Sequence, residues 1–491
     1  MFLRFLTISI LLCWPFSVTA GKVVLTSIDG TLSVEGDLVS FDDEFFRLET
    51  EFGPLTLDGG NMRCTGEACP DPNDRIARVR VGGPVGMIHN LMPSLIEVFA
   101  ERQRLGFRSL FLGDDQIVWE LRDPKTDQIL AVFEGWVQKE DVVLAQLGDG
   151  AFDISLGRKQ ARDPIRQDVI ALDAVVPLVA PENARAMVTQ AQLRGLLSGR
   201  IASWHTLDGP NQPVALHVLA GTEALLGKWH RGRIDRDATE HASATDLADV
   251  VASDETALGI GLYSAIGNAV PLVVGGACGL AIPATRDTIR SEDYPLTQPL
   301  FLQRVGARQP KILRDFIAFT RSAEAQPVIE ATGFVDQAIG RIAFERQGDR
   351  IANAVLASGE DPEAVRSVRD MVAALLDLDR LTLTFRFEDG SSDLDAQSTS
   401  NLRRLSDAIN RGDFGSKTLF FIGFSDGAGA ADGNKRLSLR RAESVRKAIS
   451  ARVAGASNTL DAMGFGEVLP MACDDTAWGR QVNRRVEVWI D

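Results

Sequence analysis

The sequence is poor in the residues on which metal and nucleophilic chemistry most often depends. Of its 491 residues, five are His and five are Cys, and the His residues are scattered along the chain. Zinc sites need clustered His and Cys ligands, and the sequence contains no such cluster. Adjacent carboxylates such as Asp42 and Asp43 are expected to point apart and not to face each other across a substrate. We therefore expect no metal, no cofactor and no enzyme activity.

Long apolar runs are also missing after the N-terminus. Residues 1–20 have a basic start at Arg4, an apolar core of residues 5–14 and small residues up to Ala20, which predicts a cleaved secretory signal peptide. The alternative is an uncleaved anchor, but the apolar core is shorter than the roughly 20 residues of a spanning helix. Cys13 follows a leucine, so we do not expect a lipoprotein signal. The mature chain is predicted to be soluble and exported.

Positive charge is in deficit. The chain has 52 Lys and Arg residues against 67 Asp and Glu residues, giving a net charge of −15. Such a chain repels nucleic acid and anionic lipid, so neither is expected as a main partner. The charges are mixed along the sequence, which is typical of a solvated surface.

The first section after the signal, residues 21–70, alternates polar and apolar residues between Gly-containing turns, which predicts a small β module. Export favours a disulfide between Cys64 and Cys69. A metal site is the alternative, but these two residues have no His or third Cys nearby. The pairing of Cys278 and Cys473 stays open.

Residues 76–338 follow a linker at 70–75 and alternate short apolar runs with helical patterns. This rhythm predicts mostly parallel sheets with covering helices, in one lobe or two. Short apolar runs at Val169–Leu172 and Val175–Val179 are among the expected strand positions. Residues 339–380 have helical spacing, which predicts a helical connector.

The final section, residues 381–491, returns to a β-α-β rhythm. The expected elements are strands at 381–387, 418–424, 463–466 and 485–490, with helices at 394–410 and 434–453. Leu437, Val445 and Ile449 are predicted to mark the buried face of the second helix.

This section contains a series of motifs in a fixed order. They are Gly423-Phe-Ser-Asp-Gly-Ala-Gly429, Asn434-Lys-Arg-Leu-Ser438, Arg441-Ala442, Gly464-Phe-Gly466 and Asn483-Arg-Arg-Val-Glu487. The series resembles the OmpA-like domain of outer-membrane proteins, peptidoglycan-associated lipoproteins and flagellar stator proteins. The resemblance implies an α+β domain of βαβαβ type that binds peptidoglycan. Ser425 departs from the family's usual Thr but keeps the hydroxyl.

The expected ligand is the diaminopimelate of the stem peptide, whose free end carries a carboxylate and an ammonium on one carbon. The resemblance assigns the ammonium to Asp426 and the carboxylate to Arg441, fifteen residues later. A guanidinium can hold a carboxylate through two parallel hydrogen bonds. Asn434 matches a further residue of the pocket, and Arg484 matches a helper. An ion pair between Asp426 and Arg441 that only closes the loop is the structural alternative.

Residues 76–338 resemble the phosphate-type periplasmic substrate-binding proteins. The resemblance rests on the opening loop and helix at 81–95, the Ser-Leu-Gly-Arg segment ending at Arg158, and the Ser-Gly-Arg-Ile segment at 198–201 followed by Trp204. It implies two α/β lobes that close on a ligand by a hinge.

Binding a small oxyanion requires several hydrogen-bond donors. The candidate ligand residues are Gly83, Arg158, Gly221 and Thr222. The first loop lacks a hydroxyl and contains Pro84, and Glu223 in the second loop would repel an anion. The alternative for Arg158 is an ion pair between the lobes.

The sequence as a whole predicts a periplasmic protein held at the cell wall or outer membrane, with peptidoglycan as its partner. Three hypotheses compete for the central section: capture of a small anion such as phosphate, recognition of an outer-membrane or periplasmic protein by a degenerate binding fold, and a cell-wall enzyme.

Overall fold

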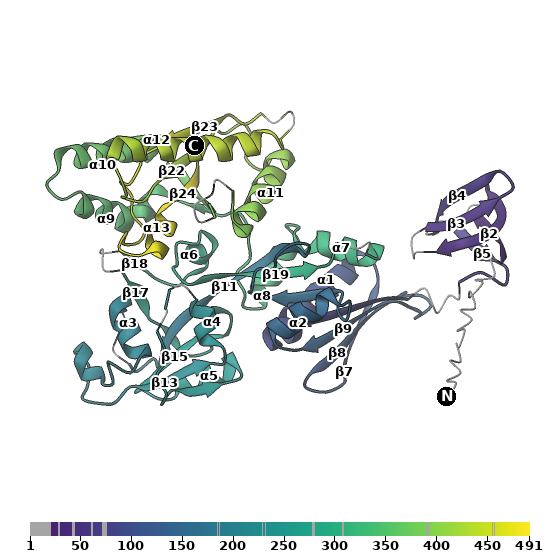
Figure 1. Cartoon of the computed structure of the whole chain (residues 1–491), viewed down its shortest axis with the longest axis horizontal. Helices are drawn as coiled ribbons and strands as arrows, with labels where there is room; N and C mark the ends of the chain where they lie inside the picture. The colour runs from purple at the N-terminus through teal and green to yellow at the C-terminus, as the bar shows by residue number, and fades with distance from the viewer. Residues whose placement is uncertain are drawn as a thin grey trace, which may run out of the picture.

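The computed structural model in Figure 1 describes residues 21–27, 30–41, 45–59, 62–70, 76–183, 185, 187–227, 229–230, 232–276, 280–306, 309–388, 391, 393–453, 455 and 457–491. The predicted signal peptide, the linker after Pro70 and Cys278 lie outside the described residues. Among the helices that are described, none combines the length and the apolar character needed to cross a bilayer.

The N-terminal unit is one antiparallel sheet in the strand order β4-β3-β2-β1-β5. Its strands are β1 (Lys22–Ser27), β2 (Ser33–Phe41), β3 (Phe45–Thr50), β4 (Gly53–Asp58) and β5 (Met62–Thr65). The alternation of side chains buries a small apolar set: Val23, Leu25, Phe46 and Leu48. The predicted disulfide between Cys64 and Cys69 is confirmed, and both residues pack against this set. The disulfide reinforces a core that is small for independent folding.

The first lobe of the central section is built around the parallel strands β9, β6 and β10. Its strands are β6 (Ala77–Gly83), β7 (Gly106–Phe111), β8 (Gln116–Arg122), β9 (Ile129–Val137) and β10 (Ile154–Gly157). Its α-helices are α1 (Met92–Arg102), α2 (Glu140–Gly148), α7 (Lys311–Thr320) and α8 (Ala325–Ala331). The apolar stripe of α1 is buried, with Leu95, Ile96 and Phe99 fully enclosed.

The second lobe packs around its own apolar core. Its strands are β12 (Met187–Thr189), β13 (Ala215–Leu219), β14 (Thr239–His241), β15 (Ala257–Leu262), β16 (Val270–Pro271), β17 (Val273–Gly275) and β18 (Ala281–Ile282). Its α-helices are α3 (Gln190–Leu197), α4 (Thr222–Leu226), α5 (Ala244–Ala252) and α6 (Arg286–Arg290). The core includes Trp204, Leu247 and Tyr294, each with 1% or less of its surface exposed.

Two long strands, β11 (Arg166–Val179) and β19 (Thr297–Arg304), join the lobes. Residues 166–174 of β11 pair with β19, and residues 175–178 pair with β15 of the second lobe. The two apolar runs at 169–172 and 175–179 therefore belong to one continuous strand. The charged Asp173 does not interrupt β11, because its buried carboxylate accepts hydrogen bonds from both lobes.

The prediction of mostly parallel sheets is also wrong. β11 runs antiparallel to both β15 and β19, and β7, β8 and β9 form an antiparallel meander. Apolar periodicity locates strands but does not fix their direction, which depends on how the chain returns between them. The fold class is confirmed, since two α/β lobes share strands β11 and β19 (Figure 1).

The C-terminal section is a five-stranded sheet in the order β20-β21-β24-β22-β23. Its strands are β20 (Arg341–Ile342), β21 (Asp379–Arg386), β22 (Leu419–Phe424), β23 (Leu460–Gly464) and β24 (Arg485–Ile490). Its helices are α11 (Ala396–Arg411), α12 (Ala431–Ser450) and α13 (Ala477–Asn483). The predicted β-α-β rhythm is present, but the short helix α13 was not expected.

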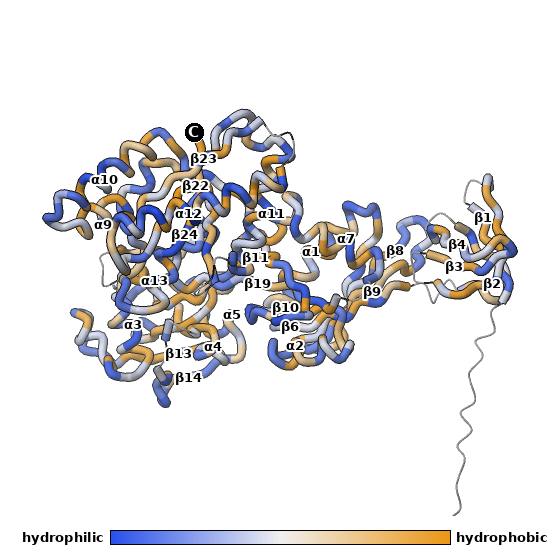
Figure 2. The backbone as a smooth tube through the Cα atoms, turned by 45° about the horizontal axis from the view of Figure 1, so that its top comes forward, coloured by the Kyte–Doolittle hydropathy of each residue, from blue (hydrophilic) through white to orange (hydrophobic). Residues whose placement is uncertain are grey.

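Residues 339–380, expected as a connector, contain α9 (Gly348–Ser358) and α10 (Pro362–Leu375). Figure 2 shows hydrophilic and hydrophobic residues alternating along both helices. Their apolar residues, including Met371 and Leu375, pack with Ile422 and Trp489 of the sheet. Helices α11 and α12 supply apolar side chains to a separate core of the same sheet. The segment therefore contributes to the core of the C-terminal section.

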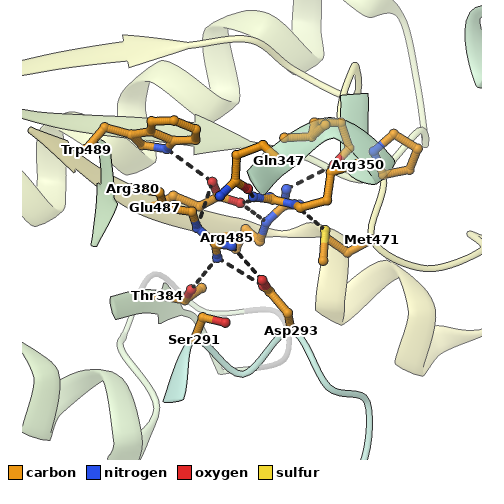
Figure 3. Close-up of polar contacts among 12 residues, drawn as sticks. Ser291, Asp293, Gln347, Arg350, Arg380, Thr384, Met471, Arg485, Glu487 and Trp489 are labelled. Atoms are coloured by element: carbon orange, nitrogen blue, oxygen red, sulfur yellow. Dashed lines mark hydrogen bonds and ion pairs between the residues drawn. The ribbon is translucent and has the colours of Figure 1, made fainter. Parts of the chain in front are cut away.

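The C-terminal section also packs against the central lobes. Met471, Ala472 and Val482 belong to the apolar core of the second lobe. Arg380 of β21 forms a buried ion pair with Asp293, which precedes β19 (Figure 3). The two sections are thus joined by both apolar contacts and buried charge.

Candidate functional site

Asp426 lies in the loop between β22 and α12, where the sequence predicted it. Its Oδ2 atom is 3.0 Å from Arg484 Nη1, and its Oδ1 atom accepts a hydrogen bond from the amide of Ala428. The side chains of Asp426 and Arg484 are 15% and 19% exposed, so the pair can be reached from solvent. The loop therefore presents an oriented carboxylate that already has a cation beside it.

Arg441 is the predicted carboxylate ligand on α12. Its Nη1 atom is buried and has no hydrogen-bond partner among the described residues. Its guanidinium carbon lies 5.6 Å from the centre of the Phe387 ring. Burial, followed by repulsion from Arg484, lowers the pKa of Arg441, while Asp426 acts in the opposite direction. An anionic ligand would offset the cost of burying this positive charge and the repulsion from Arg484.

Helix α12 approaches the sheet so closely that small residues face it. A Cβ on Gly423 would lie 2.0 Å from Ser438 O, and one on Gly464 would lie 2.3 Å from Leu439 N. The buried stripe is Asn434, Ser438, Ala442, Val445 and Ile449. The prediction that Leu437 belongs to this stripe is wrong, because the close approach places Ser438 against the sheet. Arg441 is partly exposed and lies at the edge of the stripe.

Asn434 is 5% exposed, and its Nδ2 atom donates a hydrogen bond to Glu467. Asp474 accepts a hydrogen bond of 2.6 Å from the amide of Gly427, next to Asp426. Glu467 and Asp474 were not predicted as site residues. Both lie in the segment between β23 and α13, and no motif quoted from the sequence includes them.

The three consecutive residues Asn483, Arg484 and Arg485 make different contacts. The Oδ1 atom of Asn483 accepts from the amides of Met471 and Ala472, and its Nδ2 atom donates to Asp474. Asn483 therefore holds the segment that contacts the Asp426 loop. Arg484 turns toward Asp426, whereas Arg485 is fully buried.

Arg485 belongs to an ionic network under the sheet (Figure 3). Its Nε atom is 2.8 Å from Glu487 Oε1, and Glu487 also pairs with Arg350 and Arg380. Burial favours the neutral acid, but the three arginines outweigh it and hold the pKa of Glu487 below its usual value. Arg380 extends the network to Asp293 through contacts of 2.5 and 2.9 Å. These charges are enclosed within the protein, and the pair of Arg380 with Asp293 crosses the domain junction.

Gly423 to Gly427 also has the Gly-x-Ser-x-Gly spacing of a nucleophile elbow. Ser425 is 3% exposed, and its Oγ atom is buried with no hydrogen-bond partner among the described residues. A nucleophilic Ser needs a base within hydrogen-bonding distance. The arrangement of Ser425 therefore favours a packing role.

In the central section, Arg158 is held by carboxylates. Its Nη2 atom is 2.8 Å from Asp173 Oδ2, and its Nη1 atom is 3.6 Å from Glu140 Oε1. Asp173 is fully buried and also accepts from the hydroxyl of Ser264 in the second lobe, at 2.8 Å. Two carboxylates thus surround one guanidinium. An anion that bound Arg158 would have to compete with both.

The other predicted ligand residues also have structural contacts. A Cβ on Gly83 would lie 2.8 Å from that of Leu156, so the glycine is required for packing between β6 and β10. Gly221 has a φ of 81° at the start of α4. Thr222 is 3% exposed and donates its hydroxyl to Leu219 O at 2.5 Å. No group of three or more potential metal ligands occurs in the part of the chain that the structure describes.

Comparison with known proteins defines the class of the C-terminal section. Residues 386–484 match the model of the OmpA family, so the chain contains a C-terminal OmpA domain. This match includes Asp426, Asn434, Arg441 and Arg484. It ends before Arg485 and does not include α9 and α10.

Particular relatives cover different shares of the chain. It is 26% identical over 153 residues to outer membrane porin F of Pseudomonas aeruginosa, covering 31% of this chain and 43% of the porin. It is 23% identical over 193 residues to the phosphate-binding protein PstS of Borreliella burgdorferi, covering 37% of this chain and 69% of that protein.

Among solved structures, the chain is similar to an ABC-type phosphate transport receptor from Vibrio cholerae. The TM-score is 0.40 at 18% identity, covering 52% of this chain and 99% of the receptor. The chain thus spans less than half of porin F and about two thirds of PstS among its curated relatives.

Proposed function

We propose that this chain is an exported, non-catalytic binding protein that its OmpA domain holds at peptidoglycan in the periplasm. The observation that carries the proposal is Arg441, whose buried Nη1 atom has no hydrogen-bond partner among the described residues. A buried N–H donor without a partner is costly, and a carboxylate that binds the guanidinium through two hydrogen bonds would satisfy it. Asp426 supplies the negative charge for an adjacent ammonium.

The ligand that matches both charges is the free end of diaminopimelate in the stem peptide. Its carboxylate would bind Arg441, and its ammonium would bind Asp426 beside Arg484. Asn434 would keep the first turn of α12 in place through its contact with Glu467. The family match over 386–484 supports this assignment.

Sedimentation of the full-length mature chain with purified sacculi tests the proposal. Asp426→Ala and Arg441→Ala should leave the protein in the supernatant, because each removes one of the two opposite charges. Asp432→Ala and Arg440→Ala are matched controls, since both residues are exposed on the same helix. Normal pelleting of both site variants, with folding intact, would contradict wall binding through this site.

For the central lobes, the similarity to PstS supports a ligand-binding role, with a small anion such as phosphate as the first candidate. A second candidate is recognition of an outer-membrane or periplasmic protein. The neutralisation of Arg158 by Asp173 and Glu140 favours this second role. Calorimetry of the full chain with phosphate separates these two roles, because anion capture between the lobes predicts binding that Arg158→Gln abolishes.

A further inference from the structure

A cluster of arginines lies where the OmpA domain meets the first lobe, away from both sites described above. Three guanidiniums converge on Asp168 of β11: those of Arg304, Arg321 and Arg403. Arg304 ends β19, Arg321 follows α7, and Arg403 belongs to α11 of the OmpA domain. Helix α11 packs against β11, as Figure 1 shows. The cluster is therefore assembled from both sections.

Asp168 cannot neutralise its partners. Its oxygen atoms lie 2.5 Å from Arg304 Nη1 and 2.9 Å from the Nη1 atoms of Arg321 and Arg403. Burial favours the protonated acid, but the arginines prevail and lower the pKa of Asp168 to about 2. One negative charge faces three positive charges.

A fourth arginine, Arg404, increases the excess of positive charge. Arg404 neighbours Arg403 on α11 and lies within electrostatic range of Arg321. Its Nε and Nη2 atoms are buried and have no hydrogen-bond partner among the described residues. Burial, then repulsion from Arg403, lowers the pKa of Arg404 to about 10. In folded proteins such groups are nearly always satisfied by a partner or a bound species.

The carboxylates near Arg404 do not supply hydrogen-bond partners for its buried nitrogen atoms. Asp336 and Asp407 act on Arg404 through charge alone, with no hydrogen bond to it among the described side chains. Asp336 is already paired with Arg290. Counting all of these groups, five arginines face three carboxylates, an excess of two positive charges.

The cluster also has donors that form no hydrogen bond with any residue in the described part of the chain. Arg304, Arg321 and Arg403 each use one Nη1 atom on Asp168, and a guanidinium has five N–H donors. The side chains of Arg321 and Arg403 are 31% and 44% exposed, so an ion can reach them from solvent. A small oxyanion fits this combination of convergent donors and excess charge.

We propose that Arg321, Arg403 and Arg404 form a binding site for a small inorganic oxyanion at the junction of the OmpA domain and the first lobe. The ion would bind guanidiniums from both sections and so strengthen their association. This site is separate from Arg158 and from the site at Asp426 and Arg441. It does not depend on wall binding.

The test is calorimetry and thermal melting of the full-length mature chain with sodium phosphate, and with sodium sulfate as a second probe. Sodium chloride at matched ionic strength is the reference. The wild type should bind the oxyanion and melt at a higher temperature in its presence. Arg404→Met should bind about tenfold more weakly or worse, because one charge of the cluster is lost.

Arg404→Met should fold, since it replaces an unpartnered guanidinium with an apolar chain of similar length. If it does not, Arg321→Gln replaces it in the same test. Arg411→Gln is the matched control, because Arg411 lies on α11 in an exposed pair with Asp413. Binding that survives Arg404→Met and Arg321→Gln, that is lost in Arg158→Gln instead, or that is absent from the wild type would overturn the proposal.

Discussion

Arg484 Nη1 lies 3.0 Å from Asp426 Oδ2, so the carboxylate proposed to receive an ammonium already has a cation beside it. The same Arg484 repels Arg441 and contributes to its lowered pKa. One arginine thus orients the acidic half of the site and leaves the basic half in need of an anion. This relationship makes Asp426, Arg441 and Arg484 a unit.

The three residues should differ in their contributions to sacculus binding. Arg441→Ala removes charge-assisted hydrogen bonds to the ligand, each worth about 1.5–3 kcal/mol, which corresponds to roughly tenfold to a hundredfold in affinity. Arg484→Ala removes only the group that orients Asp426 and should cost less. Quantitative pull-down with sacculi measures both. A larger loss in Arg484→Ala than in Arg441→Ala would show that the assignment of roles is wrong.

Single substitutions in the buried network at the domain junction should destabilise the protein strongly. Arg380→Met leaves Asp293 and Glu487 without a shared cation, and breaking one partner of a buried pair costs about 3–5 kcal/mol. Urea denaturation followed by intrinsic fluorescence should show a midpoint at a lower urea concentration for Arg380→Met than for the wild type. Arg369→Ala is the control, because Arg369 is 74% exposed and should change little. Equal midpoints for the two variants would contradict the network's role.

Glu292 makes the junction sensitive to pH. Its Oε2 atom is buried without a hydrogen-bond partner among the described residues, and Arg386 Nη1 lies 3.6 Å from Oε1. Burial raises the pKa of Glu292 to about 8, although Arg386 opposes this. The folded state holds the proton of Glu292 more tightly than the unfolded state does. The contribution of Glu292 to the stability of the fold is therefore full below pH 4.5 and is lost as the pH rises to 8.

The melting temperature of the wild type should therefore fall more steeply between pH 5 and pH 8 than that of Glu292→Gln. The amide is neutral throughout this range and removes the titration. Glu345→Gln, at an exposed position, should melt in parallel with the wild type. Identical pH slopes for the wild type and Glu292→Gln would refute the prediction.

The disulfide should matter mainly to the small β sheet. Replacing Cys64 and Cys69 together with Ser should destabilise that sheet by about 2 kcal/mol, according to the chain-entropy dependence on loop length. Limited trypsin digestion should then cleave within residues 21–70 faster, while the C-terminal section keeps its resistance. Unchanged cleavage would show that the apolar core is sufficient by itself.

Sequence patterns predicted the parts of the fold that depend on short separations. The βαβ rhythm after residue 381, the helix carrying Arg441 and the Cys64–Cys69 disulfide all follow from local spacing and composition. Asp426 and Arg484 were named as site residues because the family motifs include both, but the ion pair between them was not predicted. Leu437 was misassigned because helix periodicity does not reveal how closely α12 approaches Gly423 and Gly464.

Such local patterns could not predict which charged residues pair when they lie far apart in the sequence. Asp168 meets Arg403 across 235 positions, and Arg380 meets Asp293 across 87. The partners of Asp173 in β11, which are Arg158 and Ser264, were likewise not predicted. The lobes, the connector and the OmpA domain were therefore predicted as units, but the ionic contacts between them were not.

The most direct test of the central claim is calorimetry of the full-length mature chain with a stem peptide that ends in diaminopimelate. A second peptide carries an amide in place of the terminal carboxylate. The wild type should bind the unmodified peptide about tenfold more tightly or better, since the charged contact to Arg441 is lost on amidation. Arg441→Gln should bind both peptides equally weakly. Equal affinity of the wild type for both peptides would contradict the account.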